Sequence, residues 1–277
     1  MYAQHWGLVD IPFQSTIDQR WFYEGPSHEE AVARLLFIVE QHRRLGVLVG
    51  EAGTGKSMLL AVLKRAVQRA QGQVVHVNVA GRSGEEVVWE LAAGLRLSPR
   101  PDDPPRTLWR KIEEVLLGNQ LAHVQTVLVF DHFEWADREC QKAIARLVHL
   151  NTQTPTWTTM VVAVREKALQ ESCDLFRHLI DLTIQAPPFS NDESRDYVIS
   201  LLSRAGRRDP LFTDSALDRL HALSGGVPRE LNRLCDMSLL AAMSAGAVAV
   251  TADIVGSFAA EESAEKSFDR QTVLNNV

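Results

Sequence analysis

The segment from Gly50 to Ser57 reads Gly-Glu-Ala-Gly-Thr-Gly-Lys-Ser and fills every fixed position of the pattern G-x-x-x-x-G-K-[ST]. The backbone N–H groups of such a loop form a concave nest at the start of a helix, which suits a chain of anionic phosphates. Gly50, Gly53 and Gly55 allow backbone angles and close approaches that a Cβ would block. The pattern therefore predicts a phosphate-binding loop for a nucleoside triphosphate. The alternative is a glycine-rich turn without a ligand.

The residues on either side of the loop occur in the order that such a site needs. Residues 45–49 (LGVLV) form a short apolar run typical of a buried strand, and residues 57–70 have apolar side chains at helical spacing. Lys56 is expected to reach the β- and γ-phosphates, and the Ser57 hydroxyl to bind Mg²⁺. The predicted nucleotide-binding residues of this segment are Gly50, Glu51, Ala52, Gly53, Thr54, Gly55, Lys56, Ser57 and Met58.

Strand-like and helical segments alternate along the first two thirds of the chain. Four more strands are predicted at residues 74–79, 126–130, 158–164 and 182–185, and helices near residues 84–95, 107–117 and 137–150. Continuous apolar strands separated by helices favour a parallel sheet covered on both faces. The predicted fold class is therefore α/β, with a five-stranded P-loop NTPase core.

The pattern becomes entirely helical after the pair Pro187-Pro188. Helices are predicted at residues 192–205, 213–224, 228–245 and 251–262, with starts marked by Asn191, Thr213, Pro228 and Thr251. This indicates a small all-helical C-terminal domain. The predicted organisation is an N-terminal segment and helix over residues 1–41, an α/β nucleotide-binding core over 42–188, a helical domain over 189–262 and a disordered tail over 263–277.

Charge and composition limit the partners and the compartment. The formal net charge of -6 provides no overall positive field, so binding to DNA is possible but unsupported. Three widely spaced cysteines indicate reduced thiols. No apolar window is long enough to span a bilayer, and the N-terminus lacks the features of a signal peptide. We expect a cytoplasmic protein without a transmembrane segment.

An acidic residue stands where a P-loop protein needs one. Residues 126–131 (TVLVFD) place Asp131 at the end of a predicted strand, where a carboxylate helps to hold the magnesium ion. Ser57 and Asp131 are thus the predicted metal ligands, although Asp131 could instead cap the following turn. The predicted cofactors are ATP and Mg²⁺. The base preference stays open, with adenine favoured because the guanine-reading pattern N-K-x-D is absent.

Five segments together resemble the ExeA/GspA-type AAA+ ATPases associated with general secretion, and more distantly the TniB and MuB transposition ATPases. They are HWGLVDIPF, YEGPSHEEAVARLLFIVE, GEAGTGKS, VLVFD and GGVPRELNRLCD. The resemblance implies an AAA+ module with a five-stranded α/β core and a helical lid. It also implies that Leu8, Ile11, Pro12 and Phe13 line the adenine, and that Arg229 lies near the γ-phosphate as the second sensor.

The chain departs from this family at the position expected to activate water. The family has Asp-Glu at the end of the acidic strand, whereas this chain has Asp131-His132. The glutamate normally polarises the attacking water, so hydrolysis is expected to be slow or to use His132, Glu134 or Asp137 instead. The candidate catalytic residues are Lys56, Asp131, His132, Glu134 and Arg229.

Three arginines have open roles. Arg229 falls in the first turn of a predicted helix, where the helix dipole disfavours a cation, so it marks either a functional position or a solvated surface. Arg177 lies two residues before the position of the family's arginine finger. Arg165 follows the fourth predicted strand, where a polar sensor is expected, although an exposed charge there is usually solvated.

The resemblance implies an ATPase that binds ATP and ADP and couples ATP binding or hydrolysis to the assembly or remodelling of a secretion or envelope complex. It would act as a homo-oligomer with partner proteins. Two alternatives stay open: a nucleotide-gated scaffold with little hydrolysis, and a transposition-type DNA-binding ATPase regulator.

Overall fold

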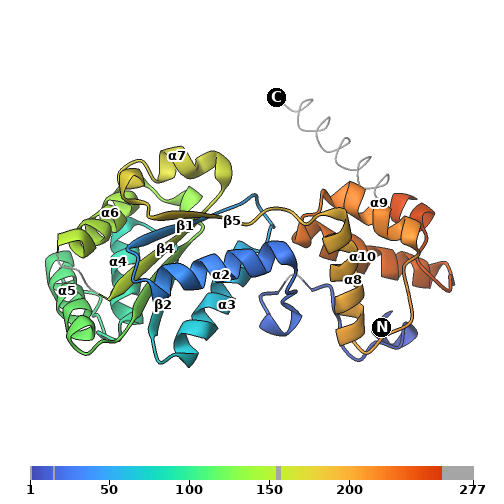
Figure 1. The fold of residues 1–277 in the computed structure, drawn as a ribbon, viewed down its shortest axis with the longest axis horizontal. Coiled ribbons are helices and arrows are strands. Elements are labelled where there is room, and N and C mark those ends of the chain that lie inside the picture. The colour runs from blue at the N-terminus through green and yellow to red at the C-terminus, as the bar shows by residue number, and fades with distance from the viewer. Residues whose placement is uncertain (1, 15, 154–156, 258–277) are drawn as a thin grey trace. The chain divides into compact units, whose positions relative to one another are not determined.

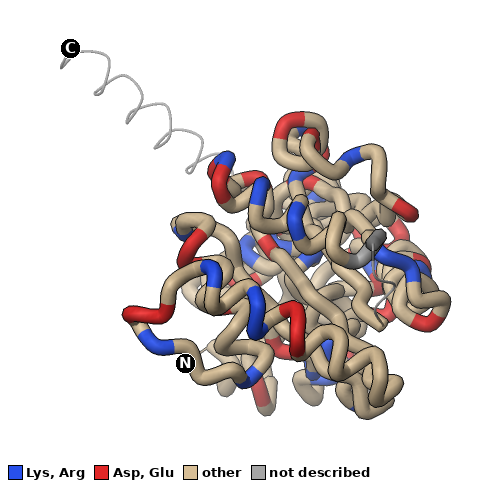
Figure 2. Tube along the Cα trace, turned by 90° about the vertical axis from the view of Figure 1, so that its left-hand side faces the viewer, with Lys and Arg blue, Asp and Glu red and all other residues tan. Residues whose placement is uncertain are grey.

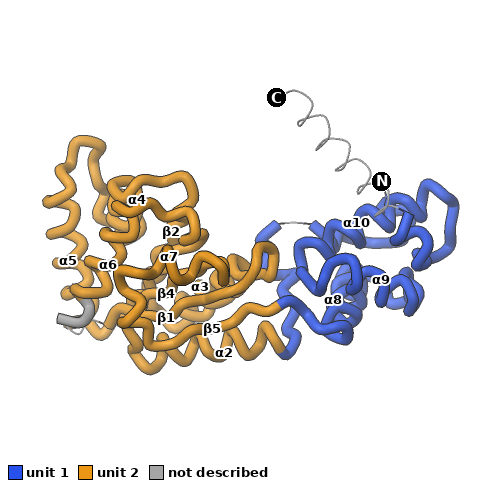
Figure 3. The backbone as a smooth tube through the Cα atoms, turned by 90° about the horizontal axis from the view of Figure 1, so that it is seen from above, with its two compact units in different colours: residues 1–26, 188–277 blue, residues 27–187 orange. Residues whose placement is uncertain are grey.

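The computed structural model describes residues 2–14, 16–153 and 157–257 (Figure 1). The chain divides into two compact units, an α/β unit of residues 27–187 and a helical unit that combines residues 1–26 with residues 188–277 (Figure 3). The predicted boundary near residue 188 coincides with this division. The predicted N-terminal segment 1–41 does not stay together, because its first 26 residues group with the helical unit.

The α/β unit contains a five-stranded parallel sheet, as the sequence predicts. Its strands lie in the order β2-β3-β4-β1-β5. Every residue of β1, β3 and β4 is buried, whereas β2 and β5 at the edges are partly exposed. This burial explains why the central strands read as continuous apolar runs. The strand bounds are β1 Leu45–Val49, β2 Gln73–Asn78, β3 Thr126–Asp131, β4 Thr158–Val164 and β5 Leu182–Gln185.

Helices cover both faces of the sheet. On one face, α2 (Pro26–Glu40) packs so closely on β1 that a Cβ on Gly46 would lie 2.3 Å from Ile38 Cδ1. The helix α3 (Lys56–Arg69) also packs on the sheet, against β2 and β3. On the other face, α4 (Gly84–Gly94) packs against β2, α5 (Pro105–Leu121) and α6 (Arg138–Gln153).

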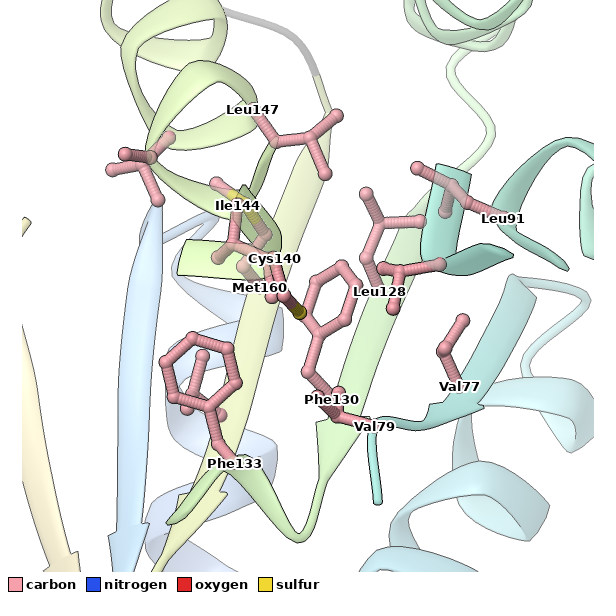
Figure 4. Close-up of a cluster of buried hydrophobic side chains, with 14 of the residues drawn as sticks. Val77, Val79, Leu91, Leu128, Phe130, Phe133, Cys140, Ile144, Leu147 and Met160 are labelled. Carbon is pink, nitrogen blue, oxygen red and sulfur yellow. The ribbon is translucent and has the colours of Figure 1, made fainter. Parts of the chain in front are cut away.

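The larger hydrophobic core lies between the sheet and the helices α4, α5 and α6. Figure 4 shows Phe130 and Leu128 of β3 meeting Ile144 of α6 and Leu91 of α4 in this cluster. The neighbouring strand residues Val127 and Val129 are equally buried but do not belong to it, as expected for side chains that alternate between the two faces of a strand. Short elements follow β3 and β4: η2 Phe133–Trp135, η3 Glu166–Ala168, α7 Leu169–Ser172 and η4 Arg177–Leu179.

The helical unit has its own apolar core. The elements of this unit are α1 (Tyr2–His5), η1 (Gln19–Trp21), α8 (Asn191–Arg204), α9 (Asp214–Ser224) and α10 (Pro228–Ser244), and residues 252–257 are also helical. The N-cap of α8 is Ser190, which forms a capping box with Glu193, and Asn191 is the first helical residue rather than the cap. The rest of the predicted helix 251–262 and the predicted tail 263–277 lie outside the described residues.

The described residues contain no helix that could span a membrane, and charges of both signs are mixed along the chain. None of the helices in the ranges given above combines the length and apolar character needed to cross a bilayer. Lys and Arg are interspersed with Asp and Glu along the trace (Figure 2). The three cysteines are buried and do not form disulfides.

Candidate functional site

The loop between β1 and α3 has the backbone that its glycines predict. Gly53 and Gly55 have φ angles of 88° and 93°, in the left-handed region that disfavours a side chain. A Cβ on Gly50 would lie 2.5 Å from the carbonyl oxygen of Ala186, just after β5. Gly55 is the N-cap of α3 and has no side chain to cap the first turn. The N–H groups at the start of α3 are therefore available to an anion.

A histidine that the sequence reasoning missed contacts this loop from α2. His28 is 4% exposed, and its Nε2 lies 3.2 Å from the carbonyl oxygen of Thr54. A Cβ on Gly55 would come within 3.1 Å of the same imidazole ring. The histidine falls inside one of the segments that carry the family resemblance, but its residue type alone gives no sign of this contact.

Lys56 folds back over the loop that precedes it. Its Nζ donates hydrogen bonds to the carbonyl oxygens of Gly50 and Glu51, both at 2.8 Å. Burial lowers the pKa of Lys56, and the nearby carboxylates of Glu134 and Asp131 partly oppose that shift. A partly desolvated ammonium group is thus held at the mouth of the loop, where an anionic ligand would stabilise its charge.

Ser57 and Asp131 meet although they are far apart in the sequence. The Ser57 hydroxyl donates a hydrogen bond of 2.7 Å to Asp131 Oδ2, and the backbone N–H of His132 donates one of 2.8 Å to Oδ1. Nε2 of His76, on β2, lies 3.8 Å from Oδ2. Burial favours a higher pKa for Asp131, but the interactions with His76 and Ser57 outweigh it and hold the pKa below its usual value. Asp131 is therefore an ionised carboxylate beside a hydroxyl.

The donor set of Ser57 and Asp131 fits Mg²⁺. Magnesium prefers hard oxygen ligands and usually takes one or two from the protein, with waters and substrate phosphates completing its octahedron. A hydroxyl oxygen and a carboxylate oxygen 2.7 Å apart beside the loop meet this need. The described residues contain no cluster of three or more His, Cys, Asp or Glu side chains suited to another kind of metal site.

The residue after Asp131 does not provide a carboxylate. His132 adopts a left-handed backbone with φ of 58°, and its Nδ1 lies 3.3 Å from Asp131 Oδ1. Its side chain is 39% exposed. The imidazole thus lies against the carboxylate of Asp131, the predicted metal ligand.

Glu134 brings a second carboxylate to the same end of the sheet. Its side chain is 8% exposed, and its Oε1 lies 2.9 Å from Nε of Arg165, the residue after β4. The guanidinium carbon of Arg165 lies 5.7 Å from the centre of the Trp135 ring. Arg165 is therefore not the isolated solvated charge that the sequence suggests. Its pairing depends on the contact between η2 and β4, which no local pattern reveals.

The predicted site residues are divided between the two units. The loop residues from Gly50 to Met58, with Asp131, His132 and Glu134, belong to the α/β unit. The other predicted residues belong to the helical unit, where Leu8, Pro12 and Phe13 are buried, Ile11 is half-buried and Arg229 is exposed. Leu8 and Phe13 are part of that unit's core. Their assignment to the adenine, and that of Arg229 to the γ-phosphate, stay predictions.

Comparison with known proteins confirms the resemblance and the fold. Residues 39–163 match the family of AAA domains. The general secretion pathway protein A of Aeromonas hydrophila is 28% identical over 251 residues, which is 89% of this chain. The chain spans about half the length of that relative, 46%. The resemblance to the ExeA/GspA-type ATPases is thus found across most of the chain.

Solved structures share the fold at low sequence identity. Cdc6p from Pyrobaculum aerophilum has a TM-score of 0.68 at 18% identity, covering 88% of this chain and 68% of its own. The Aeropyrum pernix ORC1 protein in complex with DNA has a TM-score of 0.65 at 16% identity, and the match covers 91% of this chain and 68% of the ORC1 chain. The Thermotoga maritima RuvB Holliday junction branch migration motor has a TM-score of 0.54 at 16% identity, and the match covers 83% of this chain and 67% of the RuvB chain. The α/β unit has the P-loop NTPase fold.

Proposed function

We propose that the chain is an ATPase that binds MgATP at the loop of residues 50–57. The observation that carries this proposal is the placement of Lys56, Ser57 and Asp131 at the carboxyl ends of β1 and β3. Lys56 is bonded to the loop after β1, and Ser57 is bonded to Asp131 at the end of β3. The N–H groups at the start of α3 bind the phosphates, and Lys56 neutralises charge on the β- and γ-phosphates. Ser57 and Asp131 hold Mg²⁺. When bound, the metal ion neutralises charge that develops on the phosphates.

Hydrolysis needs a group that orients the attacking water. Glu134 is the better candidate, because its buried carboxylate lies close enough to Lys56 to influence its pKa. His132 is the weaker candidate, since its imidazole turns towards Asp131. We expect turnover to be slow, because position 132 does not provide the carboxylate found in related ATPases.

A nucleotide-gated scaffold is the second candidate function. The histidine at position 132 favours it, since a protein that binds ATP without efficient hydrolysis does not need a carboxylate there. In that case ATP binding itself would drive assembly. Both candidates use the same phosphate-binding loop and differ in turnover.

The cellular role is inferred from the name of the relative. We propose a cytoplasmic homo-oligomer that couples ATP binding or hydrolysis to the assembly or remodelling of a secretion or envelope complex. The relative that supports this is a general secretion pathway protein, of which the chain spans 46%. Contact with DNA has no such support, because the Aeropyrum pernix ORC1 protein in complex with DNA is only 16% identical and the net charge is -6.

Phosphate release from MgATP by the purified chain tests the proposed activity. We expect measurable turnover that falls to background in Lys56→Ala and persists in Lys64→Ala, which removes a lysine two turns later on α3. Turnover that is unaffected by Lys56→Ala would contradict the proposal. His132→Glu separates the two candidates: a large gain favours the scaffold, and no gain or a loss favours a catalyst that uses other groups.

A further inference from the structure

A groove of about 840 Å³ lies on the helical layer formed by α4, α5 and α6. It is lined by the first halves of these helices and by the loop at residues 101–104, all within the α/β unit. The helix α4 packs against both of the other helices (Figure 1). The volume is within the range of ligand pockets, about 300–1,000 Å³. Residues 50–57 and Asp131 do not line the groove, so it is separate from the proposed nucleotide site.

Acidic side chains outnumber basic ones in this groove. Its basic residues are Lys142 and Arg146, and both are already paired within the chain. Lys142 Nζ lies 2.7 Å from Glu139 Oε1, and Arg146 Nη2 lies 3.0 Å from Glu113 Oε1. The surplus of charge in the groove is therefore negative. The carboxylates that line it are those of Glu85, Glu86, Asp102, Asp103, Asp137 and Glu139.

Two of these carboxylates are available to another molecule. Glu86 caps the first turn of α4, Asp103 forms an ion pair of 3.2 Å with a lysine, and Asp137 accepts an N–H group at the start of α6. Glu85 and Asp102, in contrast, are exposed, and their carboxylates make neither an ion pair nor a hydrogen bond with the rest of the described chain. Both can pair with a cation from outside without breaking an existing contact.

An exposed indole ring lies beside one of these two carboxylates. Trp89 is 41% exposed and follows Glu85 by four residues on α4, which places both side chains on the same face of the helix. The neighbouring Trp109 is only 8% exposed, and the guanidinium carbon of Arg146 lies 4.3 Å from the centre of its ring. No such cation covers Trp89 among the described residues. The Trp89 ring can therefore accept a cation from another molecule.

We propose that this groove binds an arginine-rich segment of a partner protein. One arginine stacks on the Trp89 ring and pairs with Glu85, and a second basic side chain pairs with Asp102. A guanidinium group is planar, stacks on aromatic rings and pairs with carboxylates through fixed donors, so it suits this combination better than an ammonium group. Charge complementarity favours such a segment and disfavours an acidic one. The inference does not depend on nucleotide binding.

Fluorescence anisotropy with labelled peptides tests the charge and the chemistry of the occupant. The probe is a short peptide of alternating arginine and glycine, and two matched peptides carry lysine or glutamate in place of arginine. We expect the wild-type chain to bind the arginine peptide most tightly and not to bind the glutamate peptide. The affinity should fall as salt is added. No binding of the arginine peptide at low salt, or equal binding of the glutamate peptide, would overturn the proposal.

The contribution of the indole ring is measured by changing it alone. Trp89→Leu keeps an apolar side chain but removes the aromatic face. We expect the affinity for the arginine peptide to fall about two- to fivefold, as for loss of an exposed cation–π contact, and the preference over the lysine peptide to disappear. Trp89→Phe keeps an aromatic face and should retain part of that preference. A full preference for arginine in Trp89→Leu would contradict the proposed stacking.

A pair of matched double variants separates the groove from the net charge of the chain. Glu85→Gln combined with Asp102→Asn should weaken binding of the arginine peptide about fivefold, as for loss of two exposed ion pairs. Glu40→Gln combined with Asp174→Asn removes two exposed carboxylates of the same unit outside the groove and should have little effect.

Equal losses in the two double variants would show that the peptide responds only to net charge, and would overturn the groove as its site. Far-UV circular dichroism of each variant shows that it is folded. The peptide is titrated without nucleotide, so failure of the chain to bind MgATP would refute the proposed function and leave this inference unaffected.

Discussion

At the scale of single residues, the site depends on polar groups held by other protein groups before any ligand arrives. Lys56 is bonded to two carbonyl oxygens of its own loop, and Ser57 is bonded to Asp131. Such fixed side chains lose little conformational freedom when a ligand binds. The proposed binding of a phosphate chain and a hard metal ion would therefore cost little side-chain entropy at these residues.

Removal of the Ser57 hydroxyl should weaken binding only when the metal is present. In Ser57→Ala, we expect the affinity for ATP with Mg²⁺ to fall about tenfold, the effect of losing one bond to a charged group. The affinity for ATP in EDTA should stay the same, because the loop amides and Lys56 do not change. Calorimetric titration in both buffers checks this. Ser57→Thr keeps the hydroxyl and should retain the affinity. Equal losses with and without metal would exclude a role for Ser57 in holding Mg²⁺.

The sequence predicts those site residues that belong to one local pattern. The loop from Gly50 to Ser57 and the acidic end of β3 are recognised because strand, loop and spacing occur in one short stretch. The pairing of Arg165 with Glu134, and the contact of His28 with Thr54, depend on which elements pack together. A contact between side chains of two separate elements cannot be predicted from the sequence of the segment that connects them.

At the scale of elements, the strand order explains how distant residues meet. Parallel strands β3, β4 and β1 are neighbours, so their carboxyl ends lie along one edge of the sheet. Asp131 ends β3, Arg165 follows β4, and the loop at Gly50 follows β1. Ligands of open α/β sheets bind at this edge. The strand bounds were predictable because long apolar runs separated by turn residues identify buried strands.

Two adjacent glycines in the helical unit allow a matched test of its packing. Gly226 has φ of 73°, and a Cβ there would lie 2.0 Å from the carbonyl oxygen of Phe189. Gly225 has φ of 59°, with nothing within 4 Å of such an atom. We expect Gly225→Ala to cost about 1–2 kcal/mol from backbone strain alone. Gly226→Ala should cost about 3 kcal/mol or more, because backbone atoms must also shift.

Urea unfolding followed by circular dichroism measures this difference. The two substitutions add the same atoms, so a larger loss at Gly226 isolates the contact with Phe189. Equal midpoints for the two variants would show that the close approach of Gly226 to Phe189 adds nothing to the cost of the substitution.

At the scale of the whole molecule, the helices of the helical unit were predictable from the sequence, but its full extent along the chain was not. The helices of the helical unit follow from their apolar spacing and start signals, such as Thr213 and Pro228. The membership of residues 1–26 in that unit was not predictable, because it arises from Trp6, Leu8 and Phe13 packing into a core formed by residues between Phe189 and Val255. Such long-range packing leaves no local periodicity.

Titration of the whole chain with MgATP in a calorimeter shows whether residues 50–57 bind a nucleotide. We expect one binding site per chain. We also expect Lys56→Ala to weaken binding by about tenfold or more, as for loss of a charged hydrogen-bonding group, and Lys64→Ala to leave it unchanged. A folded wild-type chain that releases or absorbs no heat with millimolar MgATP, and whose Tm does not change, would contradict the claim that residues 50–57 bind a nucleotide.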